Sequence, residues 1–126
     1  MLYVGKINRE LYKVITSDIT TEDVVISDER IAHSNQHGNA FEKYGKYAAD
    51  VLSDPDFIIA DKRPNTAVLY RKIETGEKTI QLILRLHVST DNPAYKNSII
   101  SFWDIGEKRR KAYEKNGKTI YKRGPL

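Results

Sequence analysis

Residues 79–88 read Thr-Ile-Gln-Leu-Ile-Leu-Arg-Leu-His-Val, and this stretch decides the fold. Side chains of a β-strand alternate between two faces, so the even positions 80–86 form an apolar face and Arg85 lies on the other. Residues 66–73 have the same strand character, and Gly76 lies in the turn between the two segments. The pattern predicts a β-hairpin.

Two further segments extend this hairpin. Phe57–Ile59 is a short apolar run between turn residues, and Asn97–Ile105 is rich in β-branched and aromatic side chains. Nearer the N-terminus, Leu2–Ile7 and Glu10–Ile15 also have strand character, and Val24–Ile26 is a short β-branched run. The four segments between residues 57 and 105 predict an antiparallel sheet of four strands.

Helices are predicted before and after these four strands along the chain. Ser27 is a good helix N-cap and predicts a short helix that ends at about Gln36. A second helix is expected from about Ala40, because apolar residues recur there at helical spacing. Glu107–Lys115 predicts a short basic helix towards the C-terminus.

Length and composition narrow the class of protein. The chain has 126 residues, so we expect residues 1–126 to form a single α+β domain with N-terminal helices packed on a four-stranded antiparallel β-sheet. Cysteine is absent, which excludes disulfides and cysteine nucleophiles and fits the cytoplasm. The N-terminus has no signal-peptide pattern, and no stretch reaches the ~20 apolar residues of a membrane span. We therefore expect a cytoplasmic protein without a membrane partner.

Positive charge is concentrated near the end of the chain. The formal net charge is +4, and residues 106–126 contain eight Lys or Arg against two Glu. This distribution favours a polyanionic partner such as RNA, which Lys108, Arg109 and Arg110 of the basic helix would contact. A solvated basic helix without a partner explains the charge equally well.

The histidines are candidates for proton transfer, because imidazole exchanges protons near neutral pH. His33 and His37 are four residues apart and share a helix face if the helix continues. Ser34 stands where the zinc-protease pattern requires Glu, so we expect neither a metal nor another cofactor. The alternatives are a half-buried helix residue for His33 and a surface residue at a strand end for His87.

Cationic side chains form a second group. Lys62 and Arg63 lie in a predicted turn. Arg85 lies within an apolar strand and needs a partner there, either a ligand phosphate or an acid such as Glu74 or Glu77. The two interpretations remain open at this point.

The fourth predicted strand carries the polar residues Asn97, Ser98, Ser101 and Trp103. Simple alternation places Asn97, Ser101 and Trp103 on one face. Hydroxyl, amide and indole N–H groups can orient a phosphate, and an indole can stack on a base. The alternative is that Trp103 belongs to the core. With an imidazole as base or acid, these groups would suffice to cut RNA by attack of the ribose 2′-OH.

Several blocks of the chain occur in the order and spacing of a known family: Val24–His33, Asp54–Ile59, Lys62–Val68, Leu82–Leu86, Lys96–Trp103 and Asn116–Lys122. In these blocks the chain resembles the phage-linked nucleases of the barnase–EndoU–colicin–RelE superfamily. The resemblance implies helices on a four-stranded antiparallel sheet. It also implies RNase activity, either toxin-like or directed by a phage or prophage against host RNA.

The resemblance also implies roles for single residues. His33 matches the general base or acid, Lys62 and Arg85 match cationic positions, and Ser101 and Trp103 match a Ser/Thr-x-Trp step similar to that of tRNA-cutting colicins. The family pattern has a second His about five residues after the first, preceded by Arg.

This chain departs from that pattern, because His37 follows His33 after four residues and the Arg is absent. Either His37 fills the second role, or the role is lost. The first hypothesis is a metal-independent endoribonuclease that acts on RNA such as tRNA and has an immunity or antitoxin protein as partner. The others are an inactive RNA- or protein-binding module of the same fold and a phage structural accessory protein.

Overall fold

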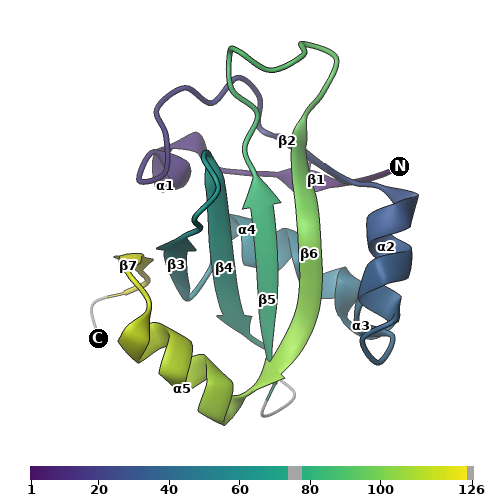
Figure 1. The fold of residues 1–126 in the computed structure, drawn as a ribbon, viewed down its shortest axis with the longest axis vertical. Coiled ribbons are helices and arrows are strands. Elements are labelled where there is room, and N and C mark those ends of the chain that lie inside the picture. Colours follow the sequence, from purple (N-terminus) through teal and green to yellow (C-terminus); the bar gives the residue numbers. More distant parts are fainter. Residues whose placement is uncertain (74–77, 125–126) are drawn as a thin grey trace.

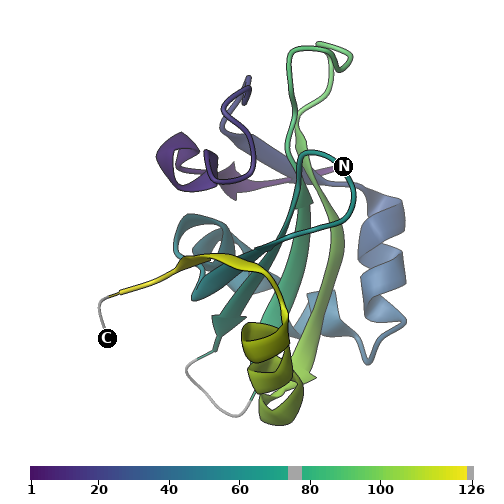
Figure 2. The ribbon, with the colours of Figure 1, turned by 60° about the vertical axis from the view of Figure 1, so that its left-hand side comes forward.

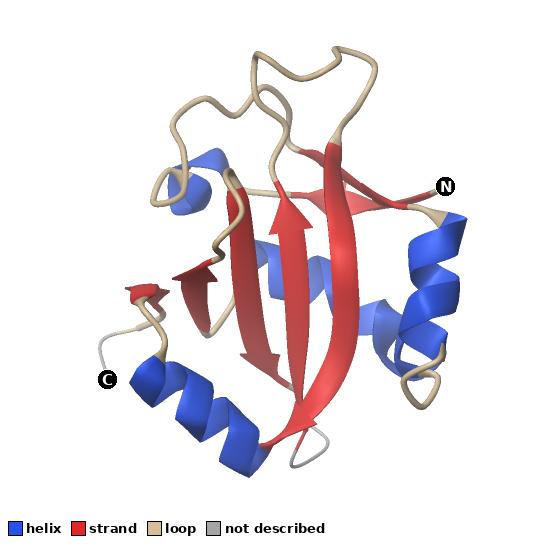
Figure 3. Ribbon diagram, in the orientation of Figure 1, coloured by secondary structure: helices blue, strands red, loops and turns tan. Residues whose placement is uncertain are grey.

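The computed structural model of the protein describes residues 1–73 and 78–124, and one mixed β-sheet runs through it (Figures 1 and 3). Its strands are β1 (Leu2–Lys6), β2 (Asp23–Ile26), β3 (Phe57–Ala60), β4 (Thr66–Lys72), β5 (Lys78–Arg85), β6 (Asn97–Gly106) and β7 (Thr119–Lys122). The seven strands follow the order β1-β2-β6-β5-β4-β3-β7. All neighbours are antiparallel except β2 and β6, which are parallel.

The expectation of a four-stranded antiparallel sheet describes only the centre, β3-β4-β5-β6. The strand β2 adds to β6 in parallel, β1 pairs with β2, and β7 pairs with β3. These three strands have only four or five residues and carry little periodicity of their own, and their place depends on partners far along the chain. The predicted turn at Gly76 lies outside the described residues.

The N-terminal segment contains a helix where a strand was expected. Residues 10–15 were expected to be extended, but α1 (Arg9–Tyr12) begins after Asn8, whose side chain accepts a hydrogen bond from the Glu10 N–H at 3.1 Å. Tyr12 is fully buried, and its hydroxyl donates to the carbonyl of Leu52 at 2.5 Å. A capped turn with one buried anchor overrides the weak strand propensity of this segment.

The other predicted helices are present with changed boundaries. The helix α2 (Asp28–Asn35) has Ser27 as its N-cap, as predicted, and ends before Gly38 and Asn39, whose φ angles of 66° and 56° are left-handed. The helix expected from Ala40 is divided into α3 (Ala40–Tyr44), a 3₁₀ turn (Gly45–Tyr47) and α4 (Ala48–Ser53). The basic helix α5 (Glu107–Asn116) follows β6 directly.

The two faces of the sheet are covered unequally. Helices α3 and α4 lie behind the sheet in Figure 1 and cover the main core, which contains Leu82 and Leu84 of β5 and the following Leu86. On the opposite face α5 packs over one end, where Tyr113 contacts a small cluster of Phe57, Val68, Tyr70 and Ile105 (Figure 2). The rest of this second face is the open face, formed by Ile83, Arg85, Ser98, Ser101 and Trp103, all half-buried.

The helix α2 protects one edge of β6. Because β2 pairs with β6 only at Asn97 and Ser98, the rest of that edge has no strand partner. The buried Ser34 of α2 donates its hydroxyl hydrogen to the backbone carbonyl of Phe102 there. This contact holds the histidine-bearing end of α2 beside the open face (Figure 1).

Among the described helices, none combines the length and apolar character needed to cross a bilayer.

Candidate functional site

A β-bulge in β6 determines which polar side chains share the open face. Ile83 pairs with Ser101 and Leu84 with Ile99, so Ile100 is an extra residue on β6. Ser98, Ser101 and Trp103 therefore lie on the face that carries Arg85, whereas Asn97 lies on the other. The alternation that grouped Asn97 with Ser101 is thus wrong, because a bulge shifts the phase of a strand by one residue.

Asn97 is buried and has a structural role. Its side chain is fully buried, donates to the carbonyls of Thr21 at 2.7 Å and Asp23 at 3.0 Å, and accepts from the His87 N–H at 2.7 Å. It thereby ties β6 to the segment that enters β2 and to the start of the β5–β6 connection. Because the side chain is buried, it is not accessible to RNA.

His87 anchors the same connection and is not the surface residue considered above. It is 6% exposed, and its Nε2–H donates to the carbonyl of Asn92 at 2.7 Å. With that tautomer, Nδ1 accepts from the Thr20 hydroxyl at 2.5 Å. Both ring nitrogens are therefore occupied within the protein.

The other two histidines are exposed at the edge of the open face. The rings of His33 and His37 lie 5.3 Å apart, edge to face. They do not share a helix face, because α2 ends at Asn35 and His37 lies in the turn that follows. The ring of His37 lies 4.8 Å from the ring of Trp103. Trp103 is half-buried, so one aromatic side chain connects the histidine pair with the sheet. Within residues 1–73 and 78–124, no group of three His, Cys, Asp or Glu side chains is arranged to hold a metal ion.

Ser101 lies on the open face between Trp103 and Arg85. Its hydroxyl oxygen is buried, and no hydrogen-bond partner for it is found among the described residues. Leaving a buried polar group unpaired costs about 1–3 kcal/mol, so natural proteins retain few of them, and functional sites are one place where they occur.

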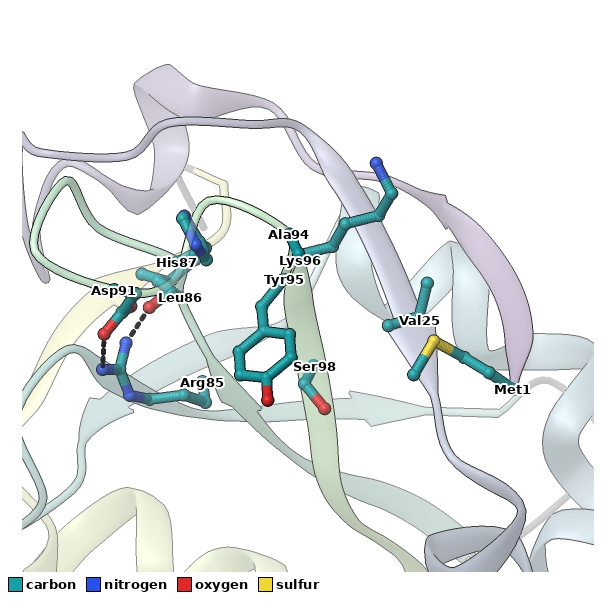
Figure 4. Close-up of a pocket in the computed structure, with 10 residues that line it drawn as sticks. All are labelled: Met1, Val25, Arg85, Leu86, His87, Asp91, Ala94, Tyr95, Lys96 and Ser98. Atoms are coloured by element: carbon teal, nitrogen blue, oxygen red, sulfur yellow. Dashed lines mark hydrogen bonds and ion pairs between the residues drawn. The ribbon is translucent and has the colours of Figure 1, made fainter.

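Arg85 forms an ion pair within the protein. Its Nη2 donates to the Asp91 carboxylate at 3.0 Å, and its Nη1 donates to the carbonyl of Leu86 (Figure 4). The Val88 N–H and the Arg85 guanidinium hold the pKa of Asp91 below its usual range. The acid that pairs with Arg85 is therefore Asp91 of the β5–β6 connection, whereas Glu74 and Glu77 lie outside the described residues.

Lys62 and Arg63 lie in the loop between β3 and β4, at the end of the sheet where Arg85 lies. Asp61 accepts from the Arg63 guanidinium at 2.7 Å, whereas the Lys62 side chain is exposed. The two cations line a shallow hollow of about 440 Å³ with Tyr70 and Tyr113. The loop is held near the end of β5, because the Leu86 N–H donates to the carbonyl of Asn65 at 2.8 Å.

The basic helix offers fewer available charges than its sequence suggests. Arg110 is mostly covered and pairs with Glu107 at 3.4 Å and Glu114 at 3.5 Å. Lys108 and Arg109 are exposed, and the Arg109 guanidinium lies 5.8 Å from the centre of the Tyr113 ring. Two of the three predicted contacts on α5 thus face solvent.

The predicted catalytic residues form a row and not one tight cluster. Trp103, beside the histidine pair, is opposite Gln81, and Arg85 lies four residues further along β5. At about 3.3 Å per residue, this places the Arg85 backbone about 13 Å from the histidine end. Lys62 belongs to the Arg85 end. The structure also places Tyr95 and Lys96 beside Arg85. Neither of these two residues is among the site residues predicted above, although an aromatic residue next to a cation is a signal of nucleic-acid binding.

Comparison with known protein families supports the resemblance noted from the sequence. Residues 4–122 match the family described as phage-Barnase-EndoU-ColicinE5/D-RelE like nuclease2. The comparisons find no matching curated protein and no matching solved structure. Because the family match covers nearly the whole chain, the protein belongs to this family of phage-linked nucleases.

Proposed function

We propose that the protein is a metal-independent endoribonuclease that cuts RNA on the open face of its sheet. The observation that carries the proposal is the row of side chains on that face. The strand pairing sets the order of this row: Arg85 is opposite Ser98 at one end, Ser101 lies in the middle, and Trp103 lies at the other end. There the His37 ring contacts Trp103. Imidazole, hydroxyl, indole and guanidinium groups are suited to acid–base catalysis and to stabilising phosphate charge.

RNA is the substrate that this chemistry favours, because its 2′-OH is an internal nucleophile. One imidazole of the His33–His37 pair takes the 2′-OH proton, and O2′ attacks the adjacent phosphorus. The bond to the 5′-oxygen breaks, and the other imidazole protonates that oxygen. The products are a 2′,3′-cyclic phosphate and a 5′-OH. The centres of the two rings lie 5.3 Å apart, which suits two oxygens of one phosphate group.

The remaining polar groups would hold the strand. The hydroxyl of Ser101 and the indole N–H of Trp103 donate to non-bridging phosphate oxygens. Arg85, Ser98 and Lys62 contact the strand beyond the cleaved linkage. We further propose a toxin-like or phage-directed activity on cellular RNA such as tRNA, with an immunity or antitoxin protein as partner. The family match supports the coarser part of this proposal, a phage-linked nuclease.

The test is cleavage of total RNA and tRNA by purified protein in EDTA, followed by analysis of the 3′ ends. His33→Ala and His37→Ala should each lower the rate by about 10²–10⁴-fold, because each removes a proton-transfer group. Gln36→Ala is the matched control, since Gln36 is exposed and lies between the two histidines along the chain. It should cleave like the unmodified protein.

Each outcome separates the alternatives. Fragments that end in 2′,3′-cyclic phosphate and disappear in both histidine variants support the proposal. Equal cleavage by all variants would exclude the histidine mechanism. RNA binding that weakens with salt but produces no fragments would indicate an inactive binding module, because phosphate contacts release counterions. Neither cleavage nor binding would favour a phage accessory protein.

A further inference from the structure

A second site lies beside Arg85, under the β5–β6 connection. It is a pocket of about 360 Å³ whose walls are largely apolar, with Val25, Leu86 and Ala94 among them. Figure 4 draws the ring of Tyr95 between Arg85 and Ser98, which line the same pocket. The pocket is distinct from the histidine end of the open face, about 13 Å away along β5.

Tyr95 is an exposed aromatic ring on a well-anchored turn. The residue is 67% exposed, the highest value among the exposed tyrosines Tyr3 and Tyr95. Its N–H donates to the carbonyl of Asn92 at 3.0 Å, and the same carbonyl accepts from the buried His87 at 2.7 Å. The backbone of Tyr95 is therefore held in place, so little backbone entropy would be lost on binding, and the exposed ring offers a flat surface for stacking.

The charges around the pocket are largely compensated. Arg85 pairs with Asp91 at 3.0 Å, and Lys96 pairs with Asp23 at 3.2 Å. A bare phosphate would thus meet two cations that each already have a carboxylate partner, and one of these carboxylates, Asp91, lines the pocket itself. An uncharged flat ring with polar edges suits the site better, because it can stack on Tyr95 while the Ser98 hydroxyl and the guanidinium of Arg85 meet its edge.

We propose that this pocket binds a nucleobase of single-stranded RNA, stacked on Tyr95, at a nucleotide outside the cleaved linkage. The proposal rests on RNA being the substrate, as proposed above, but it does not require cleavage. Stacking on an aromatic side chain is tolerant of base identity, so the pocket adds affinity and fixes the position of the strand.

The test measures binding of a 2′-O-methyl RNA hexanucleotide, which lacks the nucleophile and cannot be cut by the proposed reaction. Its partner probe is the same strand without bases. Tyr95→Ala should bind the base-containing strand about 5- to 150-fold more weakly, the range found for loss of one stacked base. Tyr95→Phe should retain binding, because the ring remains. Tyr3→Ala is the control, since Tyr3 is also exposed but does not line the pocket.

The two strands and the variants give unambiguous outcomes. Tyr95→Ala and the unmodified protein should bind the strand without bases equally, and thermal melting should be unchanged because Tyr95 is a surface residue. Unchanged binding of the base-containing strand by Tyr95→Ala would overturn the proposal, as would an equal loss in Tyr95→Phe. If binding depends on Tyr95 while the protein cuts no RNA, the nucleobase pocket stands and the catalytic proposal fails.

Discussion

Replacing Asn97 with alanine tests whether this residue holds the fold or contacts RNA. The side chain is fully buried and makes three hydrogen bonds, with the carbonyls of Thr21 and Asp23 and with the His87 N–H. Alanine leaves all three groups without this partner. The change therefore loosens the junction of β2, β6 and the β5–β6 connection without altering the open face directly.

The expected magnitude follows from how deeply each group is buried. An orphaned buried polar group costs about 1–3 kcal/mol. Thr21 and Asp23 are half-buried, so their carbonyls can regain water, whereas His87 is buried. We expect the free energy of unfolding to fall by about 2–4 kcal/mol, a large share of the roughly 5–15 kcal/mol typical of a domain.

The assay is equilibrium unfolding in urea, supported by thermal melting. For a chain of this length, the melting temperature should fall by about 3–6 °C for each kcal/mol lost. Ser98→Ala is the control, because Ser98 is next in sequence but lies half-buried on the open face, and it should change stability by less than about 0.5 kcal/mol. Unchanged stability of Asn97→Ala together with weaker RNA binding would refute the structural role.

Two further predictions concern the C-terminal part of the chain. Gly117→Ala should destabilise the junction of α5 and β7 by about 1–3 kcal/mol, because a Cβ there would lie 2.7 Å from the carbonyl oxygen of Tyr113. Gly106→Ala is the control, because a Cβ at Gly106 meets nothing within 4 Å. It should leave the melting temperature unchanged, whereas Gly117→Ala should lower it. Glu114 accepts from Lys122 at 2.8 Å, and this hydrogen bond holds the pKa of Glu114 below its usual value of 4.5. A carboxylate with a lowered pKa stabilises the fold above its unfolded pKa and loses that contribution as the pH falls through the folded value. Glu114→Gln should therefore make stability less dependent on pH below about 4.5, as measured by urea unfolding across that range; an unchanged slope would exclude this ion pair as a source of acid sensitivity.

The elements with a strong local signal could be predicted from the sequence. The strands β4 and β5 and the helix α5 lie where periodicity places them, and Ser27 caps α2 as expected. These features depend on neighbours within a few residues, which sequence patterns contain directly. The family could also be recognised from the sequence, because its short sequence blocks and their order can be read without knowing which residues are in contact.

The candidate site was predicted less completely. His33 and His37 lie close together, as their short separation in the sequence suggests, but it is the turn after α2 and not a continued helix that brings their rings together. The contact of His37 with Trp103, and the pairing of Arg85 with Asp91, join residues whose proximity no local pattern encodes. The pocket beside Tyr95 has no local signal in the sequence, because Tyr95 lies in a loop without periodicity.

Local patterns in the amino-acid sequence are enough to predict the central antiparallel strands, the N-cap of α2, the absence of cysteine chemistry and the family. Only the tertiary structure decided that β2 joins β6 in parallel, that Ile100 forms a bulge and that Asn97 is buried. The physical reason is that strand pairing and burial are set by contacts between distant segments. A single extra residue in a pairing reverses the face of every side chain on one side of it.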